Sequence, residues 1–387
     1  MAIKLQPACL EWARTRARLS AAELAKKMHV TEDKVLGWEQ SGDITLAQVE
    51  KLSKATYVPV GYMFLPEPPV EHLPVTDFRT VGSAAQQAAS PDLLDTLNVA
   101  LRRQDWYRDY MVQSGEEPLS FVGSLSVNDD VLEAADKIRA AVEWNSELRA
   151  QARDWTEALA NQTAAIENAG VLVMGSGVVG LNNNRRLDVN EFRGFALADT
   201  YAPLLFINHR DSKAARMFTL AHELVHIWLG ESGVSNVDLS QANTNVTERF
   251  CNGVAAELLV PVAELARQWQ LLNSRHDYTA ELSKYFKVSE LVIIRRLYDT
   301  SRISRAEFEA SYLDRYDTRG TEQRDESTGG GHFHYTLRSR LGRRFSAALV
   351  ASTLEGGTPY RVALSLMGVT SADVVKRFAQ YALEAAA

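Results

Sequence analysis

Two histidines and a glutamate near the middle of the chain have the spacing of a metal site. They form the segment His222-Glu223-Leu-Val-His226. Residues four apart lie on one face of a helix, so both imidazoles can reach a single ion. Glu223 can reach a water beside that ion without binding the ion itself. The pattern predicts a zinc ion held by His222 and His226, with Glu223 as the general base of a hydrolase.

A catalytic zinc ion usually takes three protein ligands, so one more donor is expected. Glu248 follows His226 by 22 residues and begins a stretch with helical periodicity. Glu248 and Asn252 share one face of that helix, which offers a carboxylate to the metal and an amide to a ligand imidazole. Glu257 is the competing carboxylate, but it lies about two and a half turns further on and should point elsewhere. We therefore expect Glu248 as the third ligand and Asn252 as support for a histidine.

Peptide hydrolysis also needs a donor for the developing charge on the carbonyl oxygen. The candidates are Arg193, Tyr201 and the segment His332-Phe-His334-Tyr335. His332 and His334 follow three glycines, and the simpler explanation is that they are surface-loop residues that bind nothing. They stay open as a secondary metal hypothesis.

Bulk composition narrows the class of protein. Hydrophobic residues make up 46% and charged residues 24% of the 387, and no apolar run reaches bilayer length, so we expect a globular protein without a membrane span. The N-terminus lacks a secretory signal, and the two cysteines, Cys9 and Cys251, suit a reducing compartment. These features predict a cytoplasmic protein. With no disulfide framework or thiolate cluster expected, any metal should use histidine and carboxylate.

The net charge of -7 is unevenly distributed along the chain. Residues 1–65 carry +2 and residues 331–387 carry +4, which leaves -13 for the part between them. An acidic body argues against an extended nucleic-acid surface, whereas local phosphate contacts at either end stay open.

The candidate site residues must be positioned by helices and strands, and the spacing of apolar residues predicts a mainly helical protein of the α+β class. Helical spacing dominates residues 91–169 and the chain after Pro261, while β-rich runs at 171–174 and 202–208 predict a small sheet. Ser289 could cap a helix in a second helix-turn-helix-like region. The expected organisation is a helix-turn-helix domain (1–65), a proline-containing linker (66–90), a zincin-like metallopeptidase domain (91–270), a second helix-turn-helix-like region (271–316) and a basic helical C-terminal region (317–387).

The first 65 residues predict two helices joined by a short turn. Ser20 to Glu23 has the form of a capping box, and Thr31 can cap the second helix. The segment LSAAELAKKMHVTEDKVLGWEQSGDITLAQVEKLSKATYVP resembles the Cro/repressor-type (XRE) helix-turn-helix family.

Binding of DNA by this first domain is an open question at the level of sequence. Its second helix begins with Glu32 and Asp33, which are typical of a helix start and repel phosphate, and no Gln, Asn or Arg stands there to read bases. A partner protein is an equal alternative to DNA. Phosphate contacts, if made, would come from the nearby cations Arg14, Arg16, Arg18, Lys26, Lys27 and Lys34.

The central segment carries a second resemblance. FALADTYAPLLFINHRDSKAARMFTLAHELVHIWLG followed by ERFCNGVAAELLVP resembles the ImmA/IrrE family of zinc metallo-endopeptidases. The resemblance implies zinc bound by His222, His226 and Glu248. Cys251 stands where that family usually has alanine, and we expect it to face away from the metal. Members of the family cleave helix-turn-helix repressors, and others of this architecture resemble antitoxin components.

These observations lead to one prediction of function and one rival. The first is a zinc-dependent endopeptidase acting on a regulatory protein, such as a helix-turn-helix repressor, in stress response, mobile-element or toxin-antitoxin control. The rival is a DNA- or toxin-binding regulator or antitoxin whose metal site is structural or vestigial. The expected partners are a protein substrate, DNA through the N-terminal domain, and a second copy of the chain in a homodimer, with no membrane.

Overall fold

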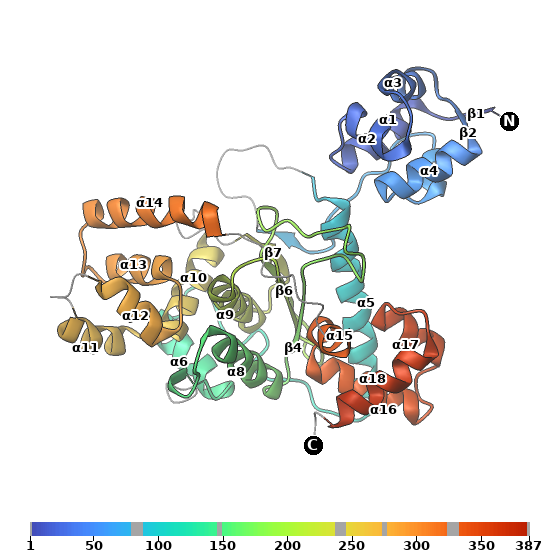
Figure 1. Cartoon of the computed structure of the whole chain (residues 1–387). Helices are drawn as coiled ribbons and strands as arrows, with labels where there is room; N and C mark the ends of the chain where they lie inside the picture. Colours follow the sequence, from blue (N-terminus) through green and yellow to red (C-terminus); the bar gives the residue numbers. More distant parts are fainter. Residues whose placement is uncertain are drawn as a thin grey trace. The chain divides into compact units, whose positions relative to one another are not determined.

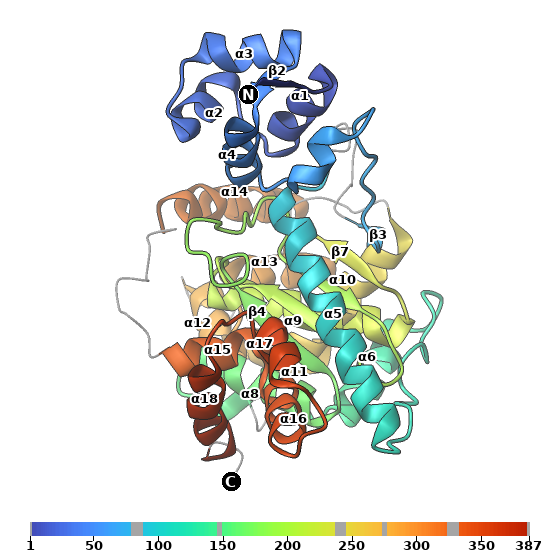
Figure 2. The same cartoon turned by 90° about the vertical axis from the view of Figure 1, so that its right-hand side faces the viewer.

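Helices dominate the computed structural model (Figure 1, Figure 2), which describes residues 2–78, 88–144, 149–236, 245–272, 277–322 and 333–384. The strands in these ranges form a two-stranded and a five-stranded sheet. The prediction of a mainly helical protein with a small β-sheet is confirmed. The chain divides into two compact units, which are described separately: unit 1 holds Met1–Pro74 and Ala85–Leu97, and unit 2 holds Val75–Ala84 and Asn98–Ala387.

Unit 1 is a small helical bundle with its own apolar core. The predicted capping box is present, since the Ser20 hydroxyl accepts from the Glu23 amide while the Glu23 carboxylate accepts from the Ser20 amide. Three residues join the second and third helices, and the first of them, His29, has a φ of 56°. Thr31 stands at the expected cap position, but its side chain makes no capping bond. The elements are β1 (Ala2–Lys4), α1 (Pro7–Arg16), α2 (Ala21–Met28), α3 (Glu32–Ser41), β2 (Asp43–Thr45), α4 (Leu46–Thr56) and the 3-10 helix η1 (Val60–Phe64).

The five-stranded sheet of unit 2 has the order β3-β7-β5-β6-β4. Its central strand β5 runs antiparallel to both neighbours, while β4 lies parallel to β6 and β3 lies parallel to β7. The β-rich runs at 171–174 and 202–208 correspond to β4 and β6, whereas the other three strands were not predicted. The strands are β3 (Thr76–Asp77), β4 (Leu172–Ser176), β5 (Gly194–Leu197), β6 (Leu204–Asn208) and β7 (Gly233–Ser235).

A group of helices packs around one long apolar helix, α9 (Lys213–Leu229), which contacts β5 and β6. The helices α8 (Trp155–Asn168) and α10 (Val246–Leu259) both pack on α9, and α6 (Val131–Ala141) packs on α10. Their side chains form the main hydrophobic core, and α9 is buried on nearly every side from Met217 to Trp228. A helix so enclosed can place polar groups where water does not compete for them.

Two further groups of helices complete unit 2. The helices α12 and α13 pack together, α14 packs on α13, and Ser289 caps α13 as predicted by accepting from the Val292 amide. The helices α15 and α16 contact β4, which forms one edge of the sheet. From Asn98 onward α5 also belongs to this unit. The bounds are α5 (Pro91–Gln113), α11 (Val262–Leu272), α12 (Tyr278–Phe286), α13 (Glu290–Asp299), α14 (Arg305–Glu322), α15 (Phe333–Leu341), α16 (Arg343–Leu354), α17 (Tyr360–Met367) and α18 (Ala372–Glu384).

Candidate metal centre

The helix α9 presents both predicted histidines on one face. Ser212 caps its N-terminus by accepting from the Ala215 amide, and Gly230 ends it with a φ of 72°. His222 and His226 lie one turn apart and are fully buried, with their Nε2 atoms 3.3 Å from each other. Two imidazole nitrogens at this separation can bind one ion.

Glu248 joins the two histidines from the first turn of α10. Asn245 caps this helix, its side-chain oxygen accepting from the Glu248 amide at 3.3 Å. The Glu248 carboxylate lies 3.4 Å from Nε2 of His222 and 3.2 Å from Nε2 of His226. Donor atoms bound tetrahedrally to one ion at about 2.0–2.1 Å stand about 3.4 Å apart, so the three separations fit a divalent metal of that size.

Asn252 holds the ring of His222, as its place on the predicted helix face suggested. Its Oδ1 lies 3.0 Å from Nδ1 of His222. An amide oxygen can only accept, so Nδ1 carries the proton and the lone pair of His222 is on Nε2, facing Glu248. The ring of His226 is instead stacked on Phe78, with centroids 5.0 Å apart.

The charges of the cluster set the pKa values of its members. Burial lowers the pKa of His222, but the neighbouring Glu248 outweighs burial and raises it. Burial raises the pKa of Glu248, but His222 and His226 outweigh burial and hold it well below its usual range. Burial and the proximity of His222 lower the pKa of His226. The carboxylate is therefore ionised, and at least one imidazole is neutral and able to bind a cation.

Glu223 is fully buried beside these residues, and neither of its carboxylate oxygens has a hydrogen-bond partner among the described residues. Burial, reinforced by the charge of Glu248, raises the pKa of Glu223 to about 8. Gly194 at the start of β5 makes room for this side chain, because a Cβ at Gly194 would lie 3.2 Å from the Glu223 Cγ. An ionisable group with a pKa near neutrality is suited to proton transfer.

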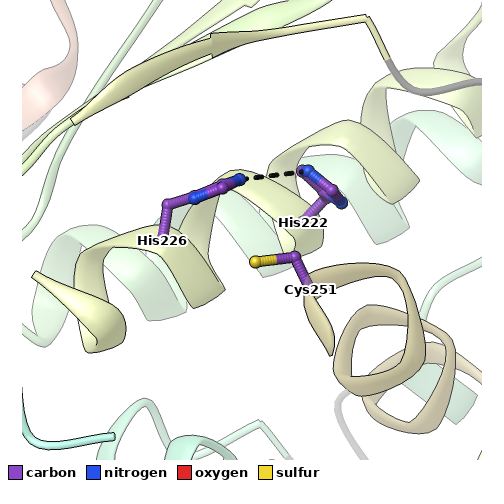
Figure 3. A group of neighbouring side chains, drawn as sticks. All are labelled: His222, His226 and Cys251. Atoms are coloured by element: carbon purple, nitrogen blue, oxygen red, sulfur yellow. Dashed lines mark hydrogen bonds between the residues drawn. The ribbon is translucent and has the colours of Figure 1, made fainter. Parts of the chain in front are cut away.

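Cys251 corrects one expectation from the sequence, that this residue faces away from the metal, and it adds a sulfur to the side chains that could hold an ion. Figure 3 shows the Cys251 thiol entering the space that holds both imidazoles. The sulfur and one ring nitrogen each of His222 and His226 all lie within 4.8 Å of one another. The reason lies in the helix, since position 251 is three residues after Glu248 and projects from a neighbouring part of the same face.

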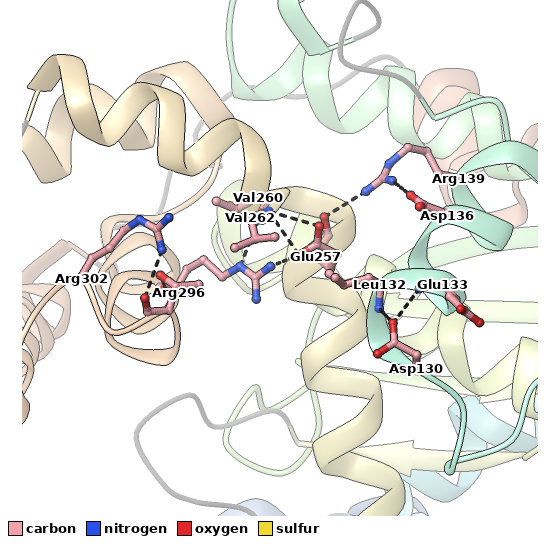
Figure 4. A network of polar contacts seen from close by, with 11 residues as sticks. Asp130, Leu132, Glu133, Asp136, Arg139, Glu257, Val260, Val262, Arg296 and Arg302 are labelled. Carbon is pink, nitrogen blue, oxygen red and sulfur yellow. Dashed lines mark hydrogen bonds and ion pairs between the residues drawn. The ribbon is translucent and has the colours of Figure 1, made fainter.

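Glu257, the competing carboxylate, is engaged elsewhere (Figure 4). It forms a buried ion pair with Arg296 of α13 and accepts from the Val262 amide at 3.2 Å. Arg296 also donates to the Val260 carbonyl at 3.0 Å. The carboxylate thus joins the end of α10 to α13.

The two candidate oxyanion donors near the sheet lie at opposite ends of β5. Arg193 precedes β5 and forms an ion pair with Asp211. Tyr201 follows the far end of β5 from Gly194, and its amide donates to Asp199 at 2.9 Å. Arg193 is therefore the one of this pair that stands next to the strand end beside Glu223.

The candidates near the C-terminus lie on another element or outside the described residues. His334 and Tyr335 belong to α15, which contacts β4 at the edge of the sheet. The ring of His334 lies 6.3 Å from that of Phe378, and Tyr335 is exposed. His332 lies outside the part of the chain that the structure describes.

Several of the cations expected to touch DNA are already engaged within unit 1. Arg14 forms a two-pronged ion pair with Glu39 at 2.7 and 2.9 Å, and Arg16 forms one with Glu71. Arg18, which follows α1, donates to the Ala88 carbonyl at 3.0 Å. The other cations of the predicted set lie on α2 and α3, namely Lys26, Lys27 and Lys34.

Comparison with known families agrees with the geometry of the site. Residues 180–298 match the IrrE N-terminal-like domain (Peptidase_M78). This IrrE-like segment contains all the clustered residues, supports the ImmA/IrrE resemblance and indicates a metallopeptidase. Residues 341–381 match a second family whose function is unknown, and no curated protein matches the chain. In the ranges that the structure describes, no helix is long and apolar enough to cross a membrane.

Proposed function

We propose that this protein is a zinc-dependent endopeptidase that cleaves a regulatory protein. The observation that carries the proposal is the buried arrangement of His222, His226 and Glu248, whose donor atoms are separated by 3.2–3.4 Å, with Glu223 beside them. Imidazole and carboxylate are the usual ligands of catalytic zinc. The donors also fit a cation because Glu248 Oε1 and Nε2 of His226 lie 3.2 Å apart, within the range for two ligands of one ion.

Different residues of the chain have different roles in the proposed peptide hydrolysis. His222, His226 and Glu248 would hold the cation, which supplies Lewis acidity to a peptide carbonyl. Glu223 accepts a proton from the attacking water and returns it to the leaving amine. Its carboxylate has no competing hydrogen bond among the described residues, and its burial makes it a stronger base than an exposed glutamate.

Unit 1 is the module that would select the substrate. A helix-turn-helix bundle can pair with a similar bundle in a repressor, and the ion pairs of Arg14 and Arg16 leave fewer cations for phosphate. A salt titration with random duplex DNA tests the competing use of this unit. Binding that weakens steeply with salt would assign unit 1 to DNA.

The test of proteolysis compares the protein with Glu223→Gln. Both forms are expressed in the native host, their metal content is determined by mass spectrometry, and newly formed protein N-termini are catalogued. We expect about one metal ion per chain in both, and new N-termini within a helix-turn-helix regulator only with the unaltered protein, since loss of a general base costs ~10²–10⁴-fold in rate. Glu133→Gln is the matched control, because Glu133 is an exposed residue of α6.

Two results would refute the proposal. One is that the unaltered protein contains metal but yields the same set of new N-termini as Glu223→Gln. The other is unaltered protein that contains no metal after purification, which would leave the rival regulator in place.

A further inference from the structure

Cys251 is a buried thiol that the proposed reaction does not use. It is fully buried on α10, between Phe250 and Asn252, and its sulfur lies within 4.8 Å of one ring nitrogen each of His222 and His226. A buried cysteine is often only a small apolar side chain in a core. This one instead adjoins the polar centre of unit 2.

The distances allow the sulfur to reach the same ion as the histidines. With bonds of about 2.3 Å to sulfur and about 2.0–2.1 Å to nitrogen, tetrahedral ligands stand about 3.6 Å apart. A sulfur already within 4.8 Å of both nitrogens needs to approach by roughly 1.2 Å at most. Cysteine has a single side-chain torsion, and its helix position beside Glu248 already directs it to the cluster.

The surroundings of the thiol favour a cation there. Both oxygens of the fully buried Glu223 lack hydrogen-bond partners among the described residues. Glu248 precedes Cys251 by three residues on the same helix, and Glu223 is the sequence neighbour of His222 on α9. Acidic groups this close to a sulfur repel a thiolate unless a cation lies between them.

We infer that Cys251 is a fourth protein ligand of the metal, which binds its thiolate sulfur together with His222, His226 and Glu248. On binding, the thiol releases its proton to solvent and its sulfur forms a bond to the cation, without transfer of electrons. The inference rests on the proposed metal site but not on peptidase activity. It gives the site a soft donor, which favours zinc and cobalt over manganese.

Cobalt(II) reports directly on this ligand. The full-length protein is stripped of metal and loaded with one equivalent of Co²⁺, and its absorption spectrum is compared with those of Cys251→Ala and Cys251→Ser. We expect a near-ultraviolet sulfur-to-cobalt charge-transfer band in the unaltered protein and its loss in Cys251→Ala. Zinc affinity should fall at least ~10-fold in Cys251→Ala, with manganese affinity changed by less than ~3-fold.

Cys9→Ala is the matched control, because Cys9 is also buried but belongs to unit 1. It should keep the band and the zinc affinity. A cobalt-loaded protein with unperturbed d-d bands and no sulfur band would refute the ligation by Cys251 while leaving the three-ligand site intact. Failure of the unaltered protein to bind any cobalt or zinc would instead refute the proposed metal site itself.

Discussion

Replacement of Gly194 by alanine tests whether the sheet sets the position of the catalytic base. Gly194 is the first residue of β5, a strand on which α9 packs. A Cβ added there would lie 2.7 Å from the Thr219 Cγ2, 2.9 Å from the Phe206 carbonyl oxygen and 3.2 Å from the Glu223 Cγ. Two of these atoms belong to α9 and the third to the backbone of β6, so no flexible chain end can move aside.

The size of the effect follows from these distances. Ordinary carbon contacts begin at about 3.5 Å, so α9 must withdraw from β5 by roughly 0.5–1 Å. Overpacking of this kind costs about 1–3 kcal/mol of the free energy of unfolding. A displacement approaching 1 Å at a catalytic group also costs ~10²-fold in rate. We expect lower stability together with a loss of peptidase activity that exceeds the loss of zinc affinity, because the Cβ would contact Glu223 directly, whereas His222 and His226 would move only with the rest of α9.

Urea unfolding, zinc titration and the catalogue of new N-termini measure the three quantities. Gly253→Ala is the control, because Gly253 lies in α10 next to Asn252 but a Cβ there meets only Val131 at 3.5 Å. Alanine in that helix should stabilise by up to about 1 kcal/mol. Gly194→Ala with unaltered stability and activity would show that the contact between β5 and α9 does not position Glu223.

Three other changes test separate parts of unit 2. Asn252→Ala should lower zinc affinity ~10- to 100-fold by freeing the His222 ring, as measured by competition with a chelator; unchanged affinity would contradict the orienting hydrogen bond. Arg296→Met should cost about 3–5 kcal/mol in urea unfolding by leaving Glu257 buried and unpaired, and adding Glu257→Gln should restore much of it; additive losses would exclude coupling. Burial lowers the pKa of His209 to about 3, below the unfolded value of about 6.5. The free energy of unfolding should therefore be unaffected by protonation of His209 above pH 6.5 and should fall by about 1.4 kcal/mol per pH unit as the pH drops below 6.5. If the free energy of unfolding of His209→Gln fell with the same slope, this expectation would be contradicted.

The spacing of residues along two helices was enough to predict the members of the cluster. His222 and His226 are four apart, and so are Glu248 and Asn252, and the structure brings each pair to one helix face. Such local periodicity is a property of the helix and needs no knowledge of the fold. The assignment of a metal and a reaction to these residues is still a prediction.

Contacts that depend on tertiary packing could not be predicted from the sequence. Phe78 lies 148 residues before His226, and the stacking of their rings depends on the pairing of β3 with β7. The ion pair of Arg193 with Asp211 likewise follows from the turn after β6. Strands as short as β3 and β7 carry too few residues to show an alternating pattern. Their pairing, and the contacts that their neighbouring side chains make, therefore could not be predicted.

Cys251 shows how an argument from composition can mislead where a local one would succeed. Counting two distant cysteines correctly excludes a disulfide framework and a thiolate cluster, yet it does not exclude one sulfur in a mixed site. The three-residue spacing from Glu248 was visible in the sequence and already placed the thiol close to the ligand face. If the cobalt spectrum carries the sulfur band, the same helix turn supplies a ligand, a sulfur donor and the Asn252 support for His222, and α10 contributes as much to the metal centre as α9.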